Sequence, residues 1–304
     1  IPPLNADQWL HECELYKNTP QYLKINSTFD LQQFKFIYFW EYLHRLWVRS
    51  LGMIFLIPFI WFLFRKMIDR FLVKRLLLVV LLTLLTASAG WIMVQSGLVD
   101  RPWVDAYKLT LHFILAVFVI LAMAKTLIDV YECKVVSLRT SRCLIHTVFG
   151  LTFVQLLVSG LMAGMKAGLY FPSWPDMNGS FIPSVLKNSD YWSWENMQLY
   201  DSIPFAPSLV HFTHRTLAYI LVVLTVVLYF KYRSRMTGLS QHVLQTVLLL
   251  VWIQVLLGIL TVLNVNGKIP LFLGVSHQLI GLLYFLGLFY LVVTIKRTPQ
   301  PEME

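Results

Sequence analysis

The chain has 304 residues, of which 57% are hydrophobic and 13% charged, and one soluble core of this length cannot bury so much apolar surface. The net charge of +9 does not indicate a nucleic-acid-binding domain, because the Lys and Arg residues stand in short clusters between long apolar runs. Cys13, Cys133 and Cys143 show no CxxC spacing, which argues against a zinc site or a disulfide framework. Lipid must therefore cover much of the chain.

Long apolar runs follow one another along the sequence. A helix that crosses the hydrocarbon layer of a bilayer needs about 20 mostly apolar residues, and seven runs meet that length. They predict an all-α, polytopic membrane protein with spans at about residues 41–64, 76–98, 108–131, 143–165, 208–230, 243–264 and 270–295.

The segments between the spans differ in their content of Lys and Arg. Alternate segments, at 65–75, 132–142, 231–241 and 296–304, carry 13 such residues in 42. The others, at 1–40, 99–107, 166–207 and 265–269, carry 7 in 96. Because basic residues flanking spans stay on the cytoplasmic side, we expect the chain to begin outside and end inside.

Two of the expected outer segments, 1–40 and 166–207, are long, aromatic and proline-bearing. Trp and Tyr favour the membrane interface, and connections of this length are often functional. We expect them to be ordered caps over a site, although simple connectors have the same composition.

A pattern of histidines recurs in the two halves. Glu41-Tyr-Leu-His44-Arg45 opens one span, and His211-Phe-Thr-His214-Arg215 opens another 170 residues later. A further histidine follows two spans on, His112 and then His277, at an offset of 165. Such a repeat predicts two pseudo-symmetric four-helix bundles related by an axis along the membrane normal.

The repeat predicts the organisation of the halves. The second half has one span more than the first, so we expect eight spans in the full protein, with the first of them missing before Ile1. The predicted halves are 1–131, with one histidine pair, and 143–295, with the other.

The histidines at 44, 112, 214 and 277 are candidates for haem ligands. Ionisable residues within spans are costly and usually functional, and these four lie about 5 to 10 Å inside the predicted outer helix ends. Imidazoles from two helices can ligate one haem iron from opposite sides. Interfacial histidines that only form hydrogen bonds are the plainer alternative.

The remaining histidines are not predicted to be ligands. His11, His146 and His242 lie in or near loops or inner helix ends and look ordinary. His211 lies one turn from His214 and is predicted to be a neighbouring group.

Charged neighbours distinguish the two pairs. Arg45 and Arg215 follow the first histidine of each pair and suit haem propionates, or else extend to lipid headgroups. Glu41 lies one helical turn from His44 and is replaced by His211 in the second half. A carboxylate at one site only suggests chemistry there and electron relay or storage at the other. Glu41, Arg45 and Arg49 would also suit a plain ion-pair ladder.

These residues resemble the haem A synthase family of alphaproteobacteria and mitochondria. The resemblance extends over essentially the whole chain, through IPPLN, FKFIYFWEYLHR, FPSWPDMNG and VHFTHR. It implies an oxidoreductase of eight spans that oxidises the methyl group at C8 of haem O to a formyl group, giving haem A for cytochrome c oxidase assembly. Some bacterial members carry a cysteine pair in an outer loop, whereas here only Cys13 lies in an outer segment.

The resemblance also implies residue roles and partners. His44 and His112 would flank the substrate haem with Arg45, Glu41 would be catalytic, and His214 and His277 would ligate a haem b beside Arg215. Haem O synthase, oxidase assembly factors and an unidentified electron acceptor are the implied protein partners. The location would be the bacterial inner membrane, with haem sites toward the periplasm, or the mitochondrial inner membrane.

Two rival functions remain at this stage. A dihaem b cytochrome that only transfers electrons would keep both haems as fixed cofactors and have no use for Glu41. A transporter built from a parallel repeat would use the histidines as proton relays and bind no haem.

Overall fold

The computed structural model describes residues 2–96, 101–131, 136–138 and 142–297. Parts of the predicted inner segments 132–142 and 296–304, with Cys133, lie outside the described residues, as do Ile1 and residues 97–100. Within the described ranges, seven helices are long and apolar enough to cross a membrane. The prediction of an all-α, polytopic membrane protein is therefore confirmed.

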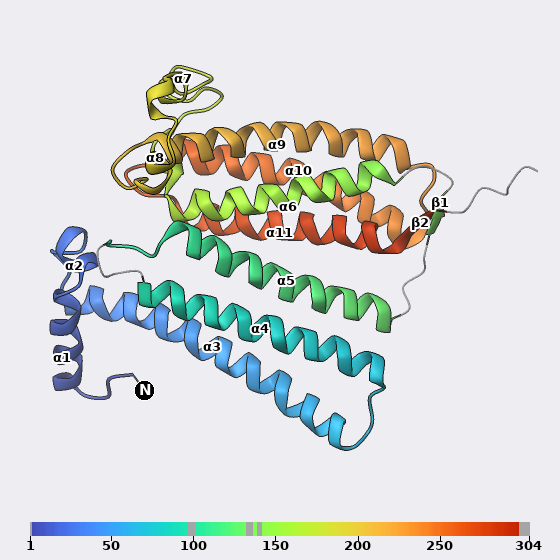
Figure 1. Cartoon of the computed structure of the whole chain (residues 1–304), viewed down its shortest axis with the longest axis horizontal. Coiled ribbons are helices and arrows are strands. Elements are labelled where there is room, and N and C mark those ends of the chain that lie inside the picture. The colour runs from blue at the N-terminus through green and yellow to red at the C-terminus, as the bar shows by residue number, and fades with distance from the viewer. Residues whose placement is uncertain (1, 97–100, 132–135, 139–141, 298–304) are drawn as a thin grey trace, which may run out of the picture. The chain divides into compact units, whose positions relative to one another are not determined.

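The seven long helices follow the predicted spans closely. They are α3 Leu31–Phe64, α4 Arg70–Ser96, α5 Ala106–Val130, α6 Cys143–Gly164, α9 Phe205–Tyr232, α10 Gly238–Leu263 and α11 Leu271–Thr294 (Figure 1). Most of their ends lie within a few residues of the predicted ones, because loss of the apolar run and loss of the helix coincide.

The start of α3 differs from the prediction, since the helix begins at Leu31 rather than near Glu41. Asp30 caps it: the side chain accepts a hydrogen bond from the Gln33 backbone N–H, and the Gln33 side chain accepts one from the Asp30 N–H in return. This capping box satisfies two helix-end donors. His44 therefore lies about 20 Å along α3 from the start of the helix.

Short elements occur in the two long segments that the sequence predicts to lie outside. The first holds α1 Ala6–Lys17 and α2 Pro20–Lys24, and the second holds η1 Ala167–Leu169, α7 Ser184–Lys187, η2 Ser189–Tyr191 and α8 Trp194–Gln198. Two three-residue strands that the sequence did not predict, β1 Val136–Leu138 and β2 Ile295–Arg297, pair in parallel. Next to these strands, the Arg142 guanidinium donates a hydrogen bond to the backbone carbonyl of Ile295, the first residue of β2, at 2.6 Å.

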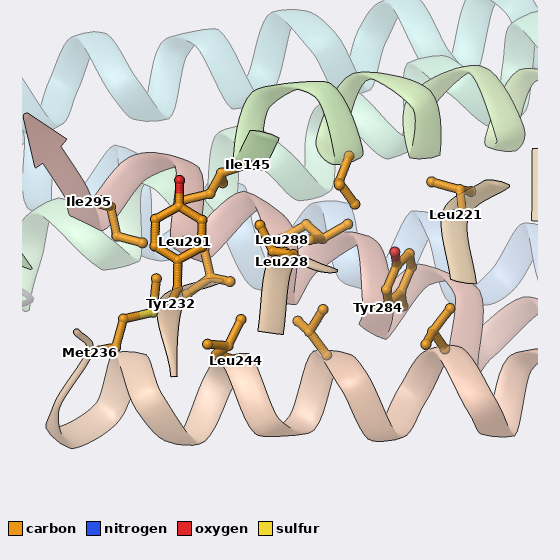
Figure 2. Packing of buried hydrophobic residues seen from close by; sticks show 13 residues of the cluster. Ile145, Leu221, Leu228, Tyr232, Met236, Leu244, Tyr284, Leu288, Leu291 and Ile295 are labelled. Carbon is orange, nitrogen blue, oxygen red and sulfur yellow. The ribbon is translucent and has the colours of Figure 1, made fainter. Parts of the chain in front are cut away.

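The chain divides into two compact units, Ile1–Val119 and Ile120–Glu304. The first contains α3, α4 and the start of α5. The second contains the bundle of α6, α9, α10 and α11, whose core includes Leu228, Tyr232, Leu244, Leu288 and Leu291 (Figure 2). Many large apolar side chains elsewhere on the long helices are exposed, as expected where lipid is the solvent.

Candidate functional site

The second unit brings one predicted histidine pair together inside the bundle. His214 from α9 and His277 from α11 have ring centroids 6.2 Å apart, with their planes at 61°. A metal–imidazole nitrogen bond is about 2 Å and the ring radius about 1 Å, so two axial ligands of one iron have centroids about 6 Å apart. The spacing of this pair fits a haem iron between the two rings.

His277 is held by α10 through both ring nitrogens. Its Nδ1 lies 3.0 Å from the backbone carbonyl oxygen of Gln254, and its Nε2 lies 3.2 Å from the Gln254 side-chain nitrogen. A carbonyl oxygen can only accept, so Nδ1 carries the proton and Nε2 keeps a lone pair. In this structure that lone pair accepts from the Gln254 side-chain amide, and a metal bound at Nε2 would take the place of this hydrogen bond.

Two glutamines that the sequence analysis missed line this pair. The Gln155 side-chain nitrogen on α6 donates to the His214 carbonyl at 3.0 Å and lies 3.1 Å from His214 Nδ1. The Oε1 atoms of Gln155 and Gln254 are both buried without a hydrogen-bond partner, which is unusual for buried polar atoms. A polar residue in the middle of an apolar span is the signal that would have pointed to them.

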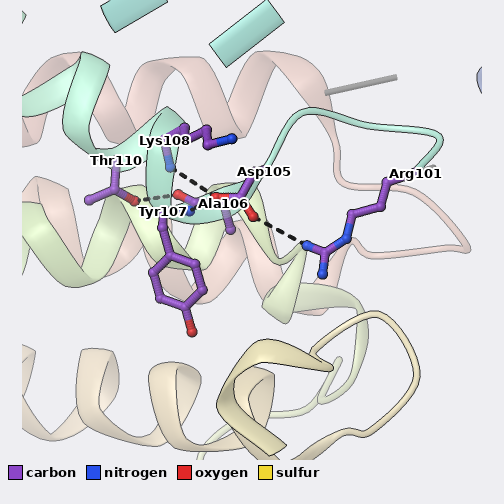
Figure 3. A network of polar contacts seen from close by, with 6 residues as sticks. All are labelled: Arg101, Asp105, Ala106, Tyr107, Lys108 and Thr110. Atoms are coloured by element: carbon purple, nitrogen blue, oxygen red, sulfur yellow. Dashed lines mark hydrogen bonds and ion pairs between the residues drawn. The ribbon is translucent and has the colours of Figure 1, made fainter. Parts of the chain in front are cut away.

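In the first unit, His112 makes a contact like that of His277. It is half-buried on α5, and its Nδ1 lies 2.9 Å from the carbonyl oxygen of Thr86 on α4. The N-terminal end of α5 is fixed by Asp105, whose carboxylate accepts from the backbone N–H groups of Tyr107 and Lys108 and pairs with Arg101 (Figure 3). The sequence analysis missed Asp105, although an Asp before an apolar run is a helix-start signal.

Glu41 and Arg45 form an ion pair along α3, with 62% and 51% of their side chains exposed. His44 is also exposed on this helix. Among the described residues, no hydrogen bond or ring contact joins His44 to His112. The ion pair corresponds to the first part of the expected ladder of Glu41, Arg45 and Arg49. The catalytic assignment of Glu41 stays a prediction.

Arg215 holds the outer segment to α9. Its guanidinium donates to the carbonyls of Phe171 at 3.2 Å, Ser173 at 2.6 Å and Asp176 at 2.6 Å, and its Nε donates to the buried His211 at 2.9 Å. These bonds occupy the donors that were expected to meet a haem propionate. Residues 171–176 are thus held against α9 by Arg215, and the expected role of this segment in covering a site stays a prediction.

The described residues contain no group of three or more His, Cys, Asp or Glu side chains placed to bind a metal ion. A haem iron can be held by two axial histidines alone, so this finding does not bear on His214 and His277. Cys13 is buried and Cys143 is exposed.

A comparison with protein families decides what kind of protein this is. The model of the family described as "Cytochrome oxidase assembly protein" (COX15-CtaA) matches residues 1–289. The chain belongs to this family.

Several relatives similar to this chain are named heme A synthase. That of Paramagnetospirillum magneticum is 37% identical over 286 residues, which cover 92% of this chain and 77% of the relative. That of Nitrosospira multiformis is 35% identical, covering 98% and 82%, and that of Bradyrhizobium diazoefficiens is 36% identical, covering 93% and 76%. The resemblance drawn from the sequence motifs is confirmed at the level of the family, while the roles of individual residues stay predictions.

Proposed function

We propose that this chain is a haem A synthase, the oxidoreductase that converts haem O to haem A for cytochrome c oxidase. The observation that carries this function is the family match over residues 1–289, with relatives named heme A synthase along nearly the whole chain. The reaction turns the methyl group at C8 of the porphyrin into a formyl group. One oxygen atom replaces two hydrogens of the methyl group. With water as the oxygen source, four electrons and four protons are released, and the electrons pass to an acceptor.

The first half of the chain, 1–131, takes the substrate haem O. His44 and His112 flank the haem, Arg45 meets a propionate, and Glu41 acts beside the methyl group as a base or as a stabiliser of positive charge. The position of Glu41 one turn from His44 supports this arrangement, as does the fixed ring nitrogen of His112. Exposure of Glu41, His44 and Arg45 leaves them accessible to a large planar substrate.

The second half, 143–295, holds a haem b between His214 and His277. The ring spacing of 6.2 Å and the lone pair on His277 Nε2 support this assignment. A haem b at this point supplies a one-electron carrier. The Arg215 guanidinium secures the cap over the outer end of α9, and pairing with a propionate requires it to release one carbonyl.

The chain is a multi-pass inner-membrane protein, with seven apolar helices in the part described. Both haem sites face the periplasm in a bacterium, because the basic segments mark the opposite ends of the helices as cytoplasmic. A mitochondrial inner membrane would keep the same arrangement. Haem O synthase and oxidase assembly factors are the expected protein partners.

Identification of the bound haems tests this function. The full-length protein is expressed with a source of haem O, purified, and its pigments are extracted and identified by chromatography and mass. We expect haem b together with haem O, its hydroxylated derivative or haem A. Two equivalents of haem b alone would instead indicate an electron-transfer cytochrome, and absence of haem would indicate a transporter.

A further inference from the structure

We propose that Gly90 and Gly258 are positioning residues that form, with the carbonyl one turn before each, a repeated seat for the histidines that face the two haems. This inference rests on the proposed haem sites and extends them to residues on the neighbouring helices.

The seat in the second unit is formed by α10. His277 Nδ1 lies 3.0 Å from the Gln254 carbonyl oxygen, and Gly258 follows four residues later on the same helix face. A Cβ atom at Gly258 would lie 3.0 Å from Cε1 of His277 and 3.5 Å from Nδ1. The imidazole therefore occupies the place of a side chain at this position.

The seat in the first unit is formed by α4 in the same order. His112 Nδ1 lies 2.9 Å from the Thr86 carbonyl oxygen, and Gly90 again follows four residues later. A Cβ atom at Gly90 would lie 2.8 Å from Cε1 of His112 and 3.0 Å from Nδ1. Thr86 and Gly90 precede Gln254 and Gly258 by the same 168 residues, so the seat repeats with the histidines.

The two parts of the seat do different work. The carbonyl accepts the Nδ1 proton, which fixes the tautomer and leaves the Nε2 lone pair for iron. The glycine allows the ring to lie against the helix backbone, which would set the orientation of the imidazole plane toward a bound haem. Gly52 and Gly150, by contrast, have nothing within 4 Å of an added Cβ.

Substitution of each glycine by alanine tests the seat in the purified, haem-loaded, full-length protein. The main readout is the electron paramagnetic resonance signal of the ferric haem b, which depends on the angle between the two imidazole planes. The reduction potential and the haem b content per chain are measured alongside it. Gly150→Ala in the second unit and Gly52→Ala in the first are the matched controls.

We expect Gly258→Ala to shift the resonance signal and the potential of haem b and to weaken haem b retention roughly tenfold. Gly90→Ala leaves the haem b signal unchanged but lowers conversion of haem O roughly tenfold and alters the spectrum of the bound substrate haem. Both controls behave as the wild type, because alanine is otherwise the better helix former. A wild-type haem b signal with normal retention in Gly258→Ala overturns the proposal.

Two further measurements distinguish failure of the seat from failure of the proposed haem b site. If His277→Ala abolishes haem b binding while Gly258→Ala has no effect, the ligand assignment stands and only the seat is wrong. If His277→Ala keeps the wild-type haem b signal, the haem b site itself is wrong. Should Gly258→Ala fail to fold, pulsed resonance on the wild-type protein reports the remote ring nitrogen, and an unprotonated Nδ1 on His277 overturns the seat.

Discussion

At the scale of single residues, Glu41 is the one proposed to act in the chemistry of haem O oxidation. Its ion pair with Arg45 is exposed, and such pairs contribute about 0–1 kcal/mol to stability. We therefore expect Glu41→Ala to leave the melting temperature nearly unchanged while haem A formation falls at least roughly 100-fold, the usual contribution of a general acid or base. The measurement is haem A per purified chain after expression with haem O.

Glu14 provides the matched control for this prediction, because it is also an exposed glutamate paired with a neighbouring cation, Lys17. Glu14→Ala should keep the wild-type yield of haem A. If a folded Glu41→Ala protein formed haem A at the wild-type level, Glu41 would not be catalytic and would only form the ion pair with Arg45.

Lys166, in the outer segment after α6, predicts a pH effect on stability. Burial lowers its pKa from 10.5 to about 8, while the charge of Asp201 acts in the opposite direction. Because the folded pKa lies below the unfolded one, the lysine destabilises the fold below about pH 8, and this effect is relieved as the pH rises toward 10.5. Lys166→Met should raise the melting temperature more at pH 7 than at pH 10. An equal change at both values would contradict this reasoning.

At the scale of elements, the outer cap depends on Arg215. The guanidinium has a planar set of donors that reaches three carbonyls at once, which a lysine ammonium cannot match. We expect Arg215→Lys to lower the opening free energy of residues 171–176 by about 2 kcal/mol, seen as faster amide hydrogen exchange in that segment. Unchanged exchange combined with loss of haem b would instead favour pairing of Arg215 with a propionate.

The contact between α10 and α11 depends on a glycine. A Cβ atom at Gly287 would lie 2.7 Å from Cγ2 of Val247, and Val247 is fully buried in the core. Gly287→Ala should lower the free energy of unfolding by about 1–3 kcal/mol through overpacking, measured by thermal unfolding in detergent. Gly150→Ala, where an added Cβ meets open space, should be neutral or stabilising, and an equal loss in both variants would refute the overpacking argument.

At the scale of the whole molecule, the sequence predicted the seven long helices well, because each membrane span must be an unbroken apolar run. It placed the start of α3 too late, since the residues from Leu31 to Trp40 are less uniformly apolar and the capping box at Asp30 was not considered. The strands β1 and β2 were not predicted, because two three-residue segments pair across a long sequence separation.

The candidate site was predictable in its histidines but not in what surrounds them. The repeated spacing singled out His44, His112, His214 and His277 because a duplicated unit repeats its functional residues. Among the described residues, the rings of His214 and His277 lie together, and the pairing of His44 with His112 stays a prediction. The supporting groups were missed, since Gln155, Gln254 and the backbone carbonyls show their role only once helices pack against one another. Arg215 was expected to pair with a haem propionate, but its guanidinium donates to the backbone carbonyls of Asp176 and Ser173.

The central claim is that the two histidine pairs serve different haems. The most direct test is the haem b absorption spectrum of the purified His277→Ala and His112→Ala proteins, each expressed with haem O. The account predicts that His277→Ala loses haem b, whereas His112→Ala keeps the haem b spectrum and forms no haem A. Loss of haem b from His112→Ala, with retention in His277→Ala, would contradict it and exchange the roles of the two sites.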